Sequence, residues 1–502
     1  MSRPTKKKWI FYKHTNDYKR IQQVVLEIRK NNASIGHEDR VWLKNRMEDL
    51  DLYKPRSLKN ESSYLDAINH NINTIKYFMF GYKAKIGKET KFMTSPLGNL
   101  YVRNIDEPQK LDKIFATMLY AIQFPHPANN QSSEFKIYPF RLIFKLLLDA
   151  RLEGKLYDYE VITILVHIED IDLQSYELLV EKIQKSRKLS MEEKKSVLLS
   201  NQDLHVTSCY EWQYYTKKIL KDAQILSVED GEEICRLSHP MKPKSKGTPT
   251  TRIAKSGSFS LREELKPLIN ELLNSEDTFT SEPVLFEEGK KFDEDYVKEI
   301  YAFYPKILLE ELGESDNEIF NSKLLKLPEL IVEYSLNKNN ETADLFEDVL
   351  CKAFNLFSNV EARRIGGSGE TDIECMHLEV EAGRNEKFAV DAKSTKKKLM
   401  QLSEGRLRAH RRNIGAKYTI IITPRYVPAV LSDIEGSDTY IIKANTFSEY
   451  IYNHLNLKIR DIDYDDIYEL IKNNKGTDLS DSLSKKTVEK FGTMNEFYEN
   501  KG

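Results

Sequence analysis

The sequence predicts a multidomain α+β protein: a helical N-terminal region with winged-helix-like units, a helical connector and a C-terminal α/β domain. Three observations predict this organisation. The chain has 502 residues, too many for one ordinary hydrophobic core, so roughly three domains are expected. Helical periodicity dominates up to about residue 338, and helices alternate with apolar strands after it. A stretch rich in Pro, Gly and Lys, 239–258, has the composition of a linker.

The composition is that of a globular protein with many charges, because 31% of the residues are charged and 40% are hydrophobic. The formal net charge of −2 neither demands nor excludes a polyanionic partner, since the local distribution of charge matters more than its sum. No apolar run approaches the length of a membrane span, and the N-terminus lacks a secretory signal, so no membrane partner is expected. Scattered cysteines without a CxxC pair predict reduced thiols of a cytoplasmic protein, without a zinc site or a disulfide framework: Cys209, Cys235, Cys351 and Cys375.

Residues 1–238 combine helices with two hairpin signals. Amphipathic spacing predicts a helix in 138–154. The segment 211–224 predicts a helix that leads into a hairpin with its turn at Asp230–Gly231. A second hairpin is expected in 91–104. Helix, helix and then helix plus hairpin is the order of a winged-helix module, and the alternative is that both hairpins are ordinary parts of a small domain.

Basic residues gather near the N-terminus and in the segment 239–258. Lys8, Trp9 and Tyr12 belong to a run in which cations and aromatic rings alternate, which suits a phosphate backbone but also a solvated face. The segment 239–258 suits either a tether or a basic strap along nucleic acid. Residues 259–338 show helical periodicity without any motif that carries chemistry.

The stretch FAVDAKS, 388–394, places two charges at the end of an apolar strand. Residues two apart on a strand share a face, so Asp391 and Lys393 point the same way, opposite to Val390 and Ala392. Asp372 follows a turn made by Gly366, Gly367 and Gly369, which lets the backbone approach a ligand closely. Two carboxylates at one strand end repel each other and attract a cation, although a surface salt bridge is the alternative for Asp391 and Lys393.

This arrangement is typical of metal-assisted phosphodiester hydrolysis. Asp372, Asp391 and the backbone carbonyl of Ala392 are predicted to bind Mg²⁺, which prefers oxygen ligands. Lys393 is predicted to orient the attacking water or to stabilise the transition state. Glu347, on the helix upstream, is predicted to join the acids as a ligand or through water, and its alternative is a solvated helix carboxylate.

A basic helix is predicted after this strand, and its cations would lie near the same edge. Arg408, Arg411 and Arg412 are the candidates for gripping DNA phosphates. Glu404 is a weaker candidate for the acidic site than Glu347, because Arg408 four residues later offers it an ion pair.

RRIGGSGETD followed by FAVDAKS resembles the PD-(D/E)xK nuclease motif of type IIS restriction endonucleases, with Asp372 and Asp391-Ala392-Lys393 at the motif positions. The sequence departs from the motif at Thr371, where many relatives have proline, and at Asp391, where many have glutamate. Neither departure removes a ligand. The stretch YPFRLIFKLLLDARLEGKLYDYEV, with the helix and hairpin downstream, resembles the N-terminal recognition region of the AlwI family.

The resemblance implies a Mg²⁺-dependent endonuclease that cuts double-stranded DNA a short distance from an asymmetric recognition sequence. It also implies a cognate DNA methyltransferase in the same system. The protein is expected to be a monomer in solution. A single catalytic site cuts one strand, so double-strand cleavage would need a transient homodimer or a second subunit. A strand-specific nicking endonuclease of the same fold and a DNA-binding regulator with an inactive nuclease domain are the alternatives. The expected parts are a DNA-recognition region (1–238), a basic linker (239–258), a helical connector (259–338), a nuclease domain (339–470) and a C-terminal tail (471–502).

Overall fold

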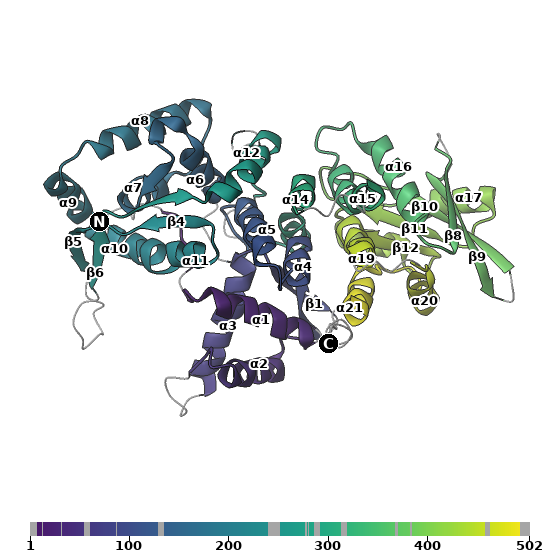
Figure 1. The fold of residues 1–502 in the computed structure, drawn as a ribbon. Coiled ribbons are helices and arrows are strands. Elements are labelled where there is room, and N and C mark those ends of the chain that lie inside the picture. The colour runs from purple at the N-terminus through teal and green to yellow at the C-terminus, as the bar shows by residue number, and fades with distance from the viewer. Residues whose placement is uncertain are drawn as a thin grey trace, which may run out of the picture.

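The computed structural model describes residues 8–12, 14–31, 33–54, 61–86, 88–128, 135–238, 251–276, 279, 281–285, 292–312, 319–366, 370–381, 384–456 and 462–491. Two large hydrophobic cores organise them. The first draws almost entirely on residues between Trp9 and Leu312, and the second on residues between Leu327 and Phe491. Figure 1 shows the corresponding helix-rich unit and sheet-containing unit side by side. Among the described helices, none is long and apolar enough to cross a membrane.

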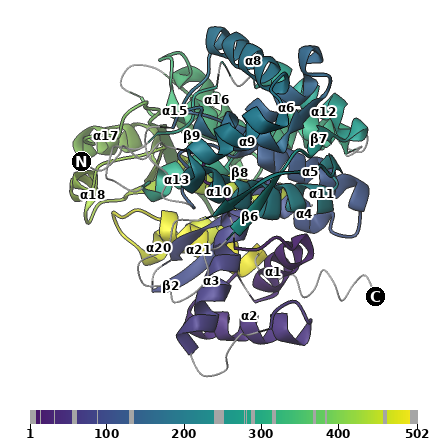
Figure 2. The same ribbon diagram turned by 90° about the vertical axis from the view of Figure 1, so that its left-hand side faces the viewer.

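The N-terminal elements pack as helices around one short hairpin. They are α1 (Tyr18–Lys30), α2 (His37–Asp49), α3 (Glu61–Tyr77), β1 (Gly81–Ile86), β2 (Glu89–Thr94), α4 (Pro96–Arg103), α5 (Pro108–Ala121) and α6 (Pro139–Leu148). Helices α2 and α3 project from the lower side of the molecule in both views (Figures 1 and 2). The helix predicted in 138–154 is α6, which ends at Leu148.

The prediction of a hairpin in 91–104 is wrong about where the hairpin lies. The hairpin is instead β1–β2, and Pro96 begins helix α4. Ser95 is the physical reason, because its hydroxyl accepts a hydrogen bond from the Gly98 amide at 2.9 Å and so caps the helix. Proline suits the first position of a helix, where its missing N–H costs nothing. Gly98 itself lies so close to the Phe80 carbonyl that a Cβ would be 2.1 Å from that oxygen.

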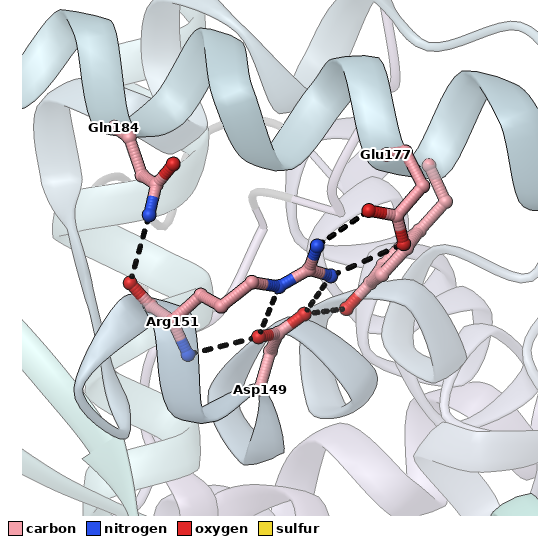
Figure 3. Close-up of polar contacts among 5 residues, drawn as sticks. Asp149, Arg151, Glu177 and Gln184 are labelled. Carbon is pink, nitrogen blue, oxygen red and sulfur yellow. Dashed lines mark hydrogen bonds and ion pairs between the residues drawn. The ribbon is translucent and has the colours of Figure 1, made fainter.

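An ion-pair network fastens the next helices to the end of α6 (Figure 3). Arg151 donates to Asp149 at 2.7–2.9 Å and also pairs with Glu177. Gln184 donates to the Arg151 carbonyl at 3.3 Å, and these contacts hold α8 against the turn. The elements here are η1 (Ala150–Leu152), β3 (Lys155–Tyr157), α7 (Asp158–Thr163), η2 (Leu165–His167) and α8 (Leu173–Arg187). Because Arg151 and Glu177 are about half exposed, the network orients α8 more than it stabilises the fold.

The segment that follows folds into helices and four strands, which form a two-stranded sheet and, together with β3, a three-stranded sheet. Its elements are α9 (Met191–Ser200), α10 (Gln202–Glu211), a π-helical turn (Trp212–Thr216), α11 (Lys217–Asp222), β4 (Leu226–Glu229), β5 (Glu233–Ser238), β6 (Thr251–Lys255) and β7 (Ser258–Leu261). A separate small core joins α7, α9, α10, β5 and β6 through Tyr159, Ile162, Leu198, Val206, Cys209, Ile234, Cys235, Leu237 and Ala254.

The hairpin turn predicted at Asp230–Gly231 is also wrong. Strand β4 pairs with β7, and β5 pairs with β6, so the two runs around Gly231 do not pair with each other. Gly231 lies instead where its backbone meets Gly257, with only 2.1 Å between the Gly257 nitrogen and a Cβ built on Gly231. The linker predicted at 239–258 is wrong in its second part, because β6 and the start of β7 are paired strands there. Residues 239–250 lie outside the described residues.

The predicted connector is divided between the two cores. Its elements are η4 (Glu263–Leu265), α12 (Lys266–Ser275), α13 (Glu294–Tyr301), α14 (Lys306–Glu311) and α15 (Ile319–Leu336). Side chains of α12, α13 and α14 belong to the first core, whereas Leu327 and Ile331 of α15 belong to the second. The region 259–338 is therefore not a unit of its own, because its apolar faces are buried against different neighbours.

The C-terminal unit is the α/β sandwich that the sequence predicts. Its five-stranded sheet has the order β12-β11-β10-β9-β8, in which β8, β9 and β10 are antiparallel and β10, β11 and β12 are parallel. The elements are α16 (Ala343–Phe354), β8 (Val360–Arg364), β9 (Ile373–Glu381), β10 (Arg384–Ala392), α17 (Glu404–Ile414), β11 (Thr419–Thr423), α18 (Ala429–Ile434), β12 (Thr439–Lys443), α19 (Ala444–Asn456), α20 (Asp465–Asn473) and α21 (Ser480–Phe491).

The two faces of this sheet are covered by different helices. Phe388, Val390 and Ile420 point to the face that α15, α16, α19, α20 and α21 cover. Ile421 and Ile441 point to the other face, against α17 and α18. The predicted C-terminal tail, 471–502, is wrong for α21, because this helix packs on α19 and buries Leu483 and Phe491 among other side chains. Residues 492–502 lie outside the described part of the chain.

Candidate active site

The candidate site lies where β10 outruns its antiparallel neighbour. The last residue pair between β10 and β9 is Val390 with Ile373. Asp391 and Ala392 continue beyond it and pair only with β11. Side chains alternate across the sheet, so Val390 enters the second core while Asp391 points to the face of α17.

The structure brings Asp372, Asp391 and Lys393 together at this edge. The Lys393 ammonium pairs with the Asp391 carboxylate and lies 4.0 Å from Oδ2 of Asp372. The same Asp372 oxygen accepts a hydrogen bond of 2.7 Å from the Ala392 amide. Because the amide and the carbonyl of a strand residue point to the same side, the Ala392 carbonyl is directed toward the edge that Asp372 occupies.

Burial and a neighbouring charge change the ionisation of Asp372. Its side chain is about one-fifth exposed, and that of Asp391 is almost completely buried. Burial and, after it, the nearby Asp391 carboxylate raise the pKa of Asp372 to about 7, against the opposing effects of Lys393 and the Ala392 amide. Two acids therefore share one edge at which a second negative charge is unfavourable.

A turn between β8 and β9 fixes Asp372 through its backbone. The Ile365 and Gly366 amides donate to the Asp372 carbonyl at 2.9 and 3.4 Å. Gly366 has a φ of +59°, a left-handed conformation that favours glycine. The Thr371 hydroxyl donates to the Val390 carbonyl at 3.3 Å and ties the turn to β10. The other two glycines of the predicted turn, Gly367 and Gly369, lie outside the described residues.

Glu347 is not brought onto the two acids by any contact that the structure records. Its carboxylate pairs with Arg364 at 2.8–2.9 Å, and Arg364 also contacts Asp344 and Asp348. A Cβ placed on Gly366 would lie 3.9 Å from the Glu347 carboxylate, so Glu347 flanks the turn. The upstream acid that the sequence predicts is thus near the site but held by an arginine.

Helix α17 supplies both structural and exposed cations. Arg411 is buried, and its guanidinium donates to Glu404 at 2.8 Å, to Thr419 at 3.1 Å and to Thr439 at 2.7 Å. These contacts correct the expectation that Arg411 grips phosphate, because its donors face the sheet. Glu404 pairs with Arg411, and its carboxylate lies 3.4 Å from Nε of Arg408. Because both contacts hold this carboxylate on α17, Glu404 does not join Asp372 and Asp391. Arg408 and Arg412 are exposed.

His410 is part of the same predicted basic helix, but it is not one of its exposed cations. It is buried on α17, and its Nδ1 has no hydrogen-bond partner. Burial lowers its pKa, Arg406 lowers it further, and Asp391 opposes them, which places His410 within electrostatic reach of the acidic site. In the N-terminal basic run, by contrast, two described residues are structural, because Trp9 is fully buried and Lys8 pairs with Glu211 at 2.6 Å.

The donor set fits a hard divalent cation. Across the described ranges, no group of three or more His, Cys, Asp or Glu side chains could hold a metal ion. The site offers two carboxylates and a backbone carbonyl instead, and such oxygen ligands suit a cation that retains several waters. A cation between Asp372 and Asp391 would also relieve the repulsion that raises the pKa of Asp372.

Comparisons with known proteins identify the family. Residues 4–275 match the family described as "Type II restriction endonuclease HgaI, N-terminal domain". Over 485 residues the chain is 46% identical to the type II restriction enzyme HgaI of Avibacterium volantium. The aligned region covers 96% of this chain and 98% of that enzyme. This chain belongs to the HgaI family of type II restriction endonucleases. Membership of the HgaI family makes the chain a site-specific DNA endonuclease.

Two solved structures of the restriction endonuclease FokI show weaker similarity to this HgaI-family chain. Free FokI has 9% identity and a TM-score of 0.27, with 94% of this chain and 99% of FokI covered. FokI bound to DNA has 8% identity and a TM-score of 0.26, with 94% and 100% covered. These values are too low to support any structural argument. The resemblance to the AlwI family is not confirmed by these comparisons.

Proposed function

We propose that the chain is a type IIS restriction endonuclease that hydrolyses DNA phosphodiester bonds a short distance from an asymmetric recognition sequence, with Mg²⁺ as cofactor. The observation that carries this proposal is the convergence of Asp372, Asp391 and Lys393 on one sheet edge. This edge lies in the C-terminal unit, outside the part that matches the HgaI N-terminal domain. An enzyme that cuts outside its recognition sequence needs separate parts of the chain for recognition and for cutting.

In the proposed mechanism, the carboxylates of Asp372 and Asp391 and the carbonyl of Ala392 would hold Mg²⁺, as in a PD-(D/E)xK motif. When bound, Mg²⁺ lowers the pKa of a coordinated water and neutralises charge on the scissile phosphate. The Ala392 amide holds the Asp372 carboxylate in place. Lys393, kept at the site by Asp391, donates toward the attacking water or the charge that develops on phosphate oxygens. Glu347 would act there only after exchanging Arg364 for a new partner.

We further propose that the small core formed by α7, α9, α10, β5 and β6 is a winged-helix-like unit that contacts duplex DNA. Helices α9 and α10 are joined by the single residue Asn201, and the strand pair β5–β6 packs beside them. An exposed helix of such a unit fits the major groove of DNA. Arg408 and Arg412 on α17 are the proposed phosphate contacts of the nuclease unit.

Double-strand cleavage by one site requires a transient homodimer or a second subunit, and a restriction system requires a cognate methyltransferase. The four free cysteines support a cytoplasmic location. A nicking endonuclease with the same site is the second candidate, because this chain carries one Asp372–Asp391–Lys393 set and one set cuts one strand.

Digestion of supercoiled plasmids tests the proposal. Linear fragments that form only with Mg²⁺ and whose sequenced ends lie at a fixed distance from one asymmetric sequence are expected. Open circles alone would establish the nicking alternative. DNA binding without any cleavage would indicate a regulator with an inactive nuclease domain and contradict the proposal.

A further inference from the structure

Three cations line the carboxyl ends of the parallel strands next to the acidic site. Lys398 follows β10, Arg425 follows β11, and Lys443 ends β12, and we call these three residues the basic edge. The Leu399 amide donates to the Arg425 carbonyl at 2.9 Å, so Lys398 and Arg425 lie on neighbouring segments. In the sheet, Ala392 aligns with Ile422, and Ile422 aligns with Ile442. The basic edge therefore continues the strand ends at which Asp391 and Lys393 lie.

Helix α13 places three carboxylates on the basic edge. Asp293, the N-cap of α13, pairs with Lys398 at 3.1 Å. Asp295 pairs with Lys443 at 3.1 Å. Glu299 pairs with Arg425 at 2.6 Å. The Arg425 guanidinium also lies over the Tyr296 ring, 4.3 Å from its centroid. Each cation of the edge is thus matched by one acid from the same helix segment.

The opposite side of α13 belongs to the N-terminal unit. Ile300 and Tyr301 are buried in the first core, and the Tyr301 hydroxyl donates to the Lys76 carbonyl at 2.6 Å. Helix α13 contacts β1 of the N-terminal unit and α19 of the nuclease unit. The acids are therefore held by the unit of the first core, whereas the cations are held by the unit that carries Asp391.

We propose that the basic edge binds backbone phosphates of the DNA that is cut, and that α13 occupies this edge in the DNA-free protein. The inference rests on the proposed function. Carboxylates and phosphates accept the same charge-assisted hydrogen bonds from Lys and Arg, so α13 and DNA compete for one surface. Three adjacent cations beside a site for phosphodiester hydrolysis suit a phosphate backbone, which supplies most nonspecific affinity for DNA. Engagement of DNA by the nuclease then requires its separation from α13.

The test neutralises the helix and compares it with a matched control. The variant D293N/D295N/E299Q removes three negative charges, and asparagine keeps the helix cap at position 293. The control E181Q/E263Q/E310Q removes the same charge from carboxylates that pair with Lys185, Lys266 and Lys306 within their own helical turns. A third variant, K398A/K443A, removes two cations of the edge. Binding to a short duplex without the recognition sequence is measured by fluorescence anisotropy over a range of salt concentrations.

We expect D293N/D295N/E299Q to bind this duplex about tenfold more tightly than the control and to cut it faster. The reason is that the carboxylates of α13 no longer compete with DNA phosphates for the basic edge. Misfolding would not produce a gain of affinity. We expect K398A/K443A to reduce the slope of log affinity against log salt by about 2, since each lost phosphate contact contributes about 0.9.

If D293N/D295N/E299Q and its control bound the duplex with equal affinity, the proposal that α13 occupies the basic edge would be wrong. An unchanged salt slope in K398A/K443A would overturn the phosphate contact. Wild-type protein that neither binds nor cuts any DNA in the presence of Mg²⁺ would instead refute the proposed function, and the inference with it.

Discussion

At the residue scale, Asp372 derives its properties from what surrounds it. The position of the acids follows from sequence, because the two-residue period of a strand puts Asp391 and Lys393 on one face. The ionisation of Asp372 does not follow from sequence. It depends first on burial and then on the Asp391 carboxylate, with the Ala392 amide opposing both, and a turn between two strands brings the Asp372 carboxyl group to this place.

Asp372→Asn should change how stability depends on pH. The folded state raises the pKa of Asp372 from its ordinary 3.8 to about 7, so the folded protein favours the protonated acid. Its contribution to stability is full below pH 4 and is lost as the pH rises toward 7. In EDTA, the free energy of unfolding of Asp372→Asn should therefore rise relative to wild type between pH 4 and 7. Parallel pH curves for wild type and variant would contradict this, and Asp203→Asn on the surface of α10 is the control.

Neighbouring arginines on α17 should respond differently to truncation. Arg411→Ala breaks a buried pair and leaves Glu404 short of its main partner, which should cost about 3 kcal/mol of unfolding free energy. Arg412→Ala, one residue later and exposed, should change stability by less than about 0.5 kcal/mol. Urea unfolding of both variants checks this, and equal destabilisation would contradict the buried role of Arg411. The sequence does not predict this difference between Arg411 and Arg412, because both belong to one run of basic residues. The acceptors of Arg411, Thr419 and Thr439, come from strands farther along the chain.

At the element scale, the sequence predicts the C-terminal unit better than the N-terminal one. Helix α16, the strands β8 to β12 and helix α17 follow from periodicity, since each is a continuous apolar or amphipathic run. The N-terminal hairpins do not follow, because the signal at Asp230–Gly231 is local whereas its pairing is not. Strand β4 pairs with β7, about thirty residues away, and a turn signal carries no information about such a partner.

Two glycine substitutions separate a required glycine from a dispensable one. Gly231→Ala would place a Cβ 2.1 Å from the Gly257 nitrogen and should destabilise the protein by about 1–3 kcal/mol. Gly405→Ala, on helix α17 with no atom within 4 Å of its Cβ, should stabilise it by about 0.5–1 kcal/mol. Thermal unfolding measures both. A Gly231→Ala variant as stable as wild type would show that β4–β5 and β6–β7 can separate at this point without cost.

At the scale of the whole molecule, two cores divide the chain into a unit that matches the HgaI N-terminal domain and a unit that carries the acids. The sequence indicates this division through its change of periodicity, but it does not show that α13 joins the first core while it contacts the second unit. Long-range ion pairs such as Glu299–Arg425 have no signature in local sequence. In the proposed arrangement, the C-terminal unit keeps a fixed place until DNA provides another partner for its basic edge.

The measurement that tests the central claim most directly is plasmid cleavage by Asp391→Asn across a range of Mg²⁺ concentrations. Its control is Glu386→Gln, an acid on the same strand but away from the strand end. Asp391→Asn should bind DNA like wild type and cut at least about 10³-fold more slowly, because a cation at the site stabilises the transition state by several kcal/mol. Glu386→Gln should cut like wild type. Cleavage by Asp391→Asn at the wild-type rate would show that the edge formed by Asp372, Asp391 and Lys393 is not the catalytic site.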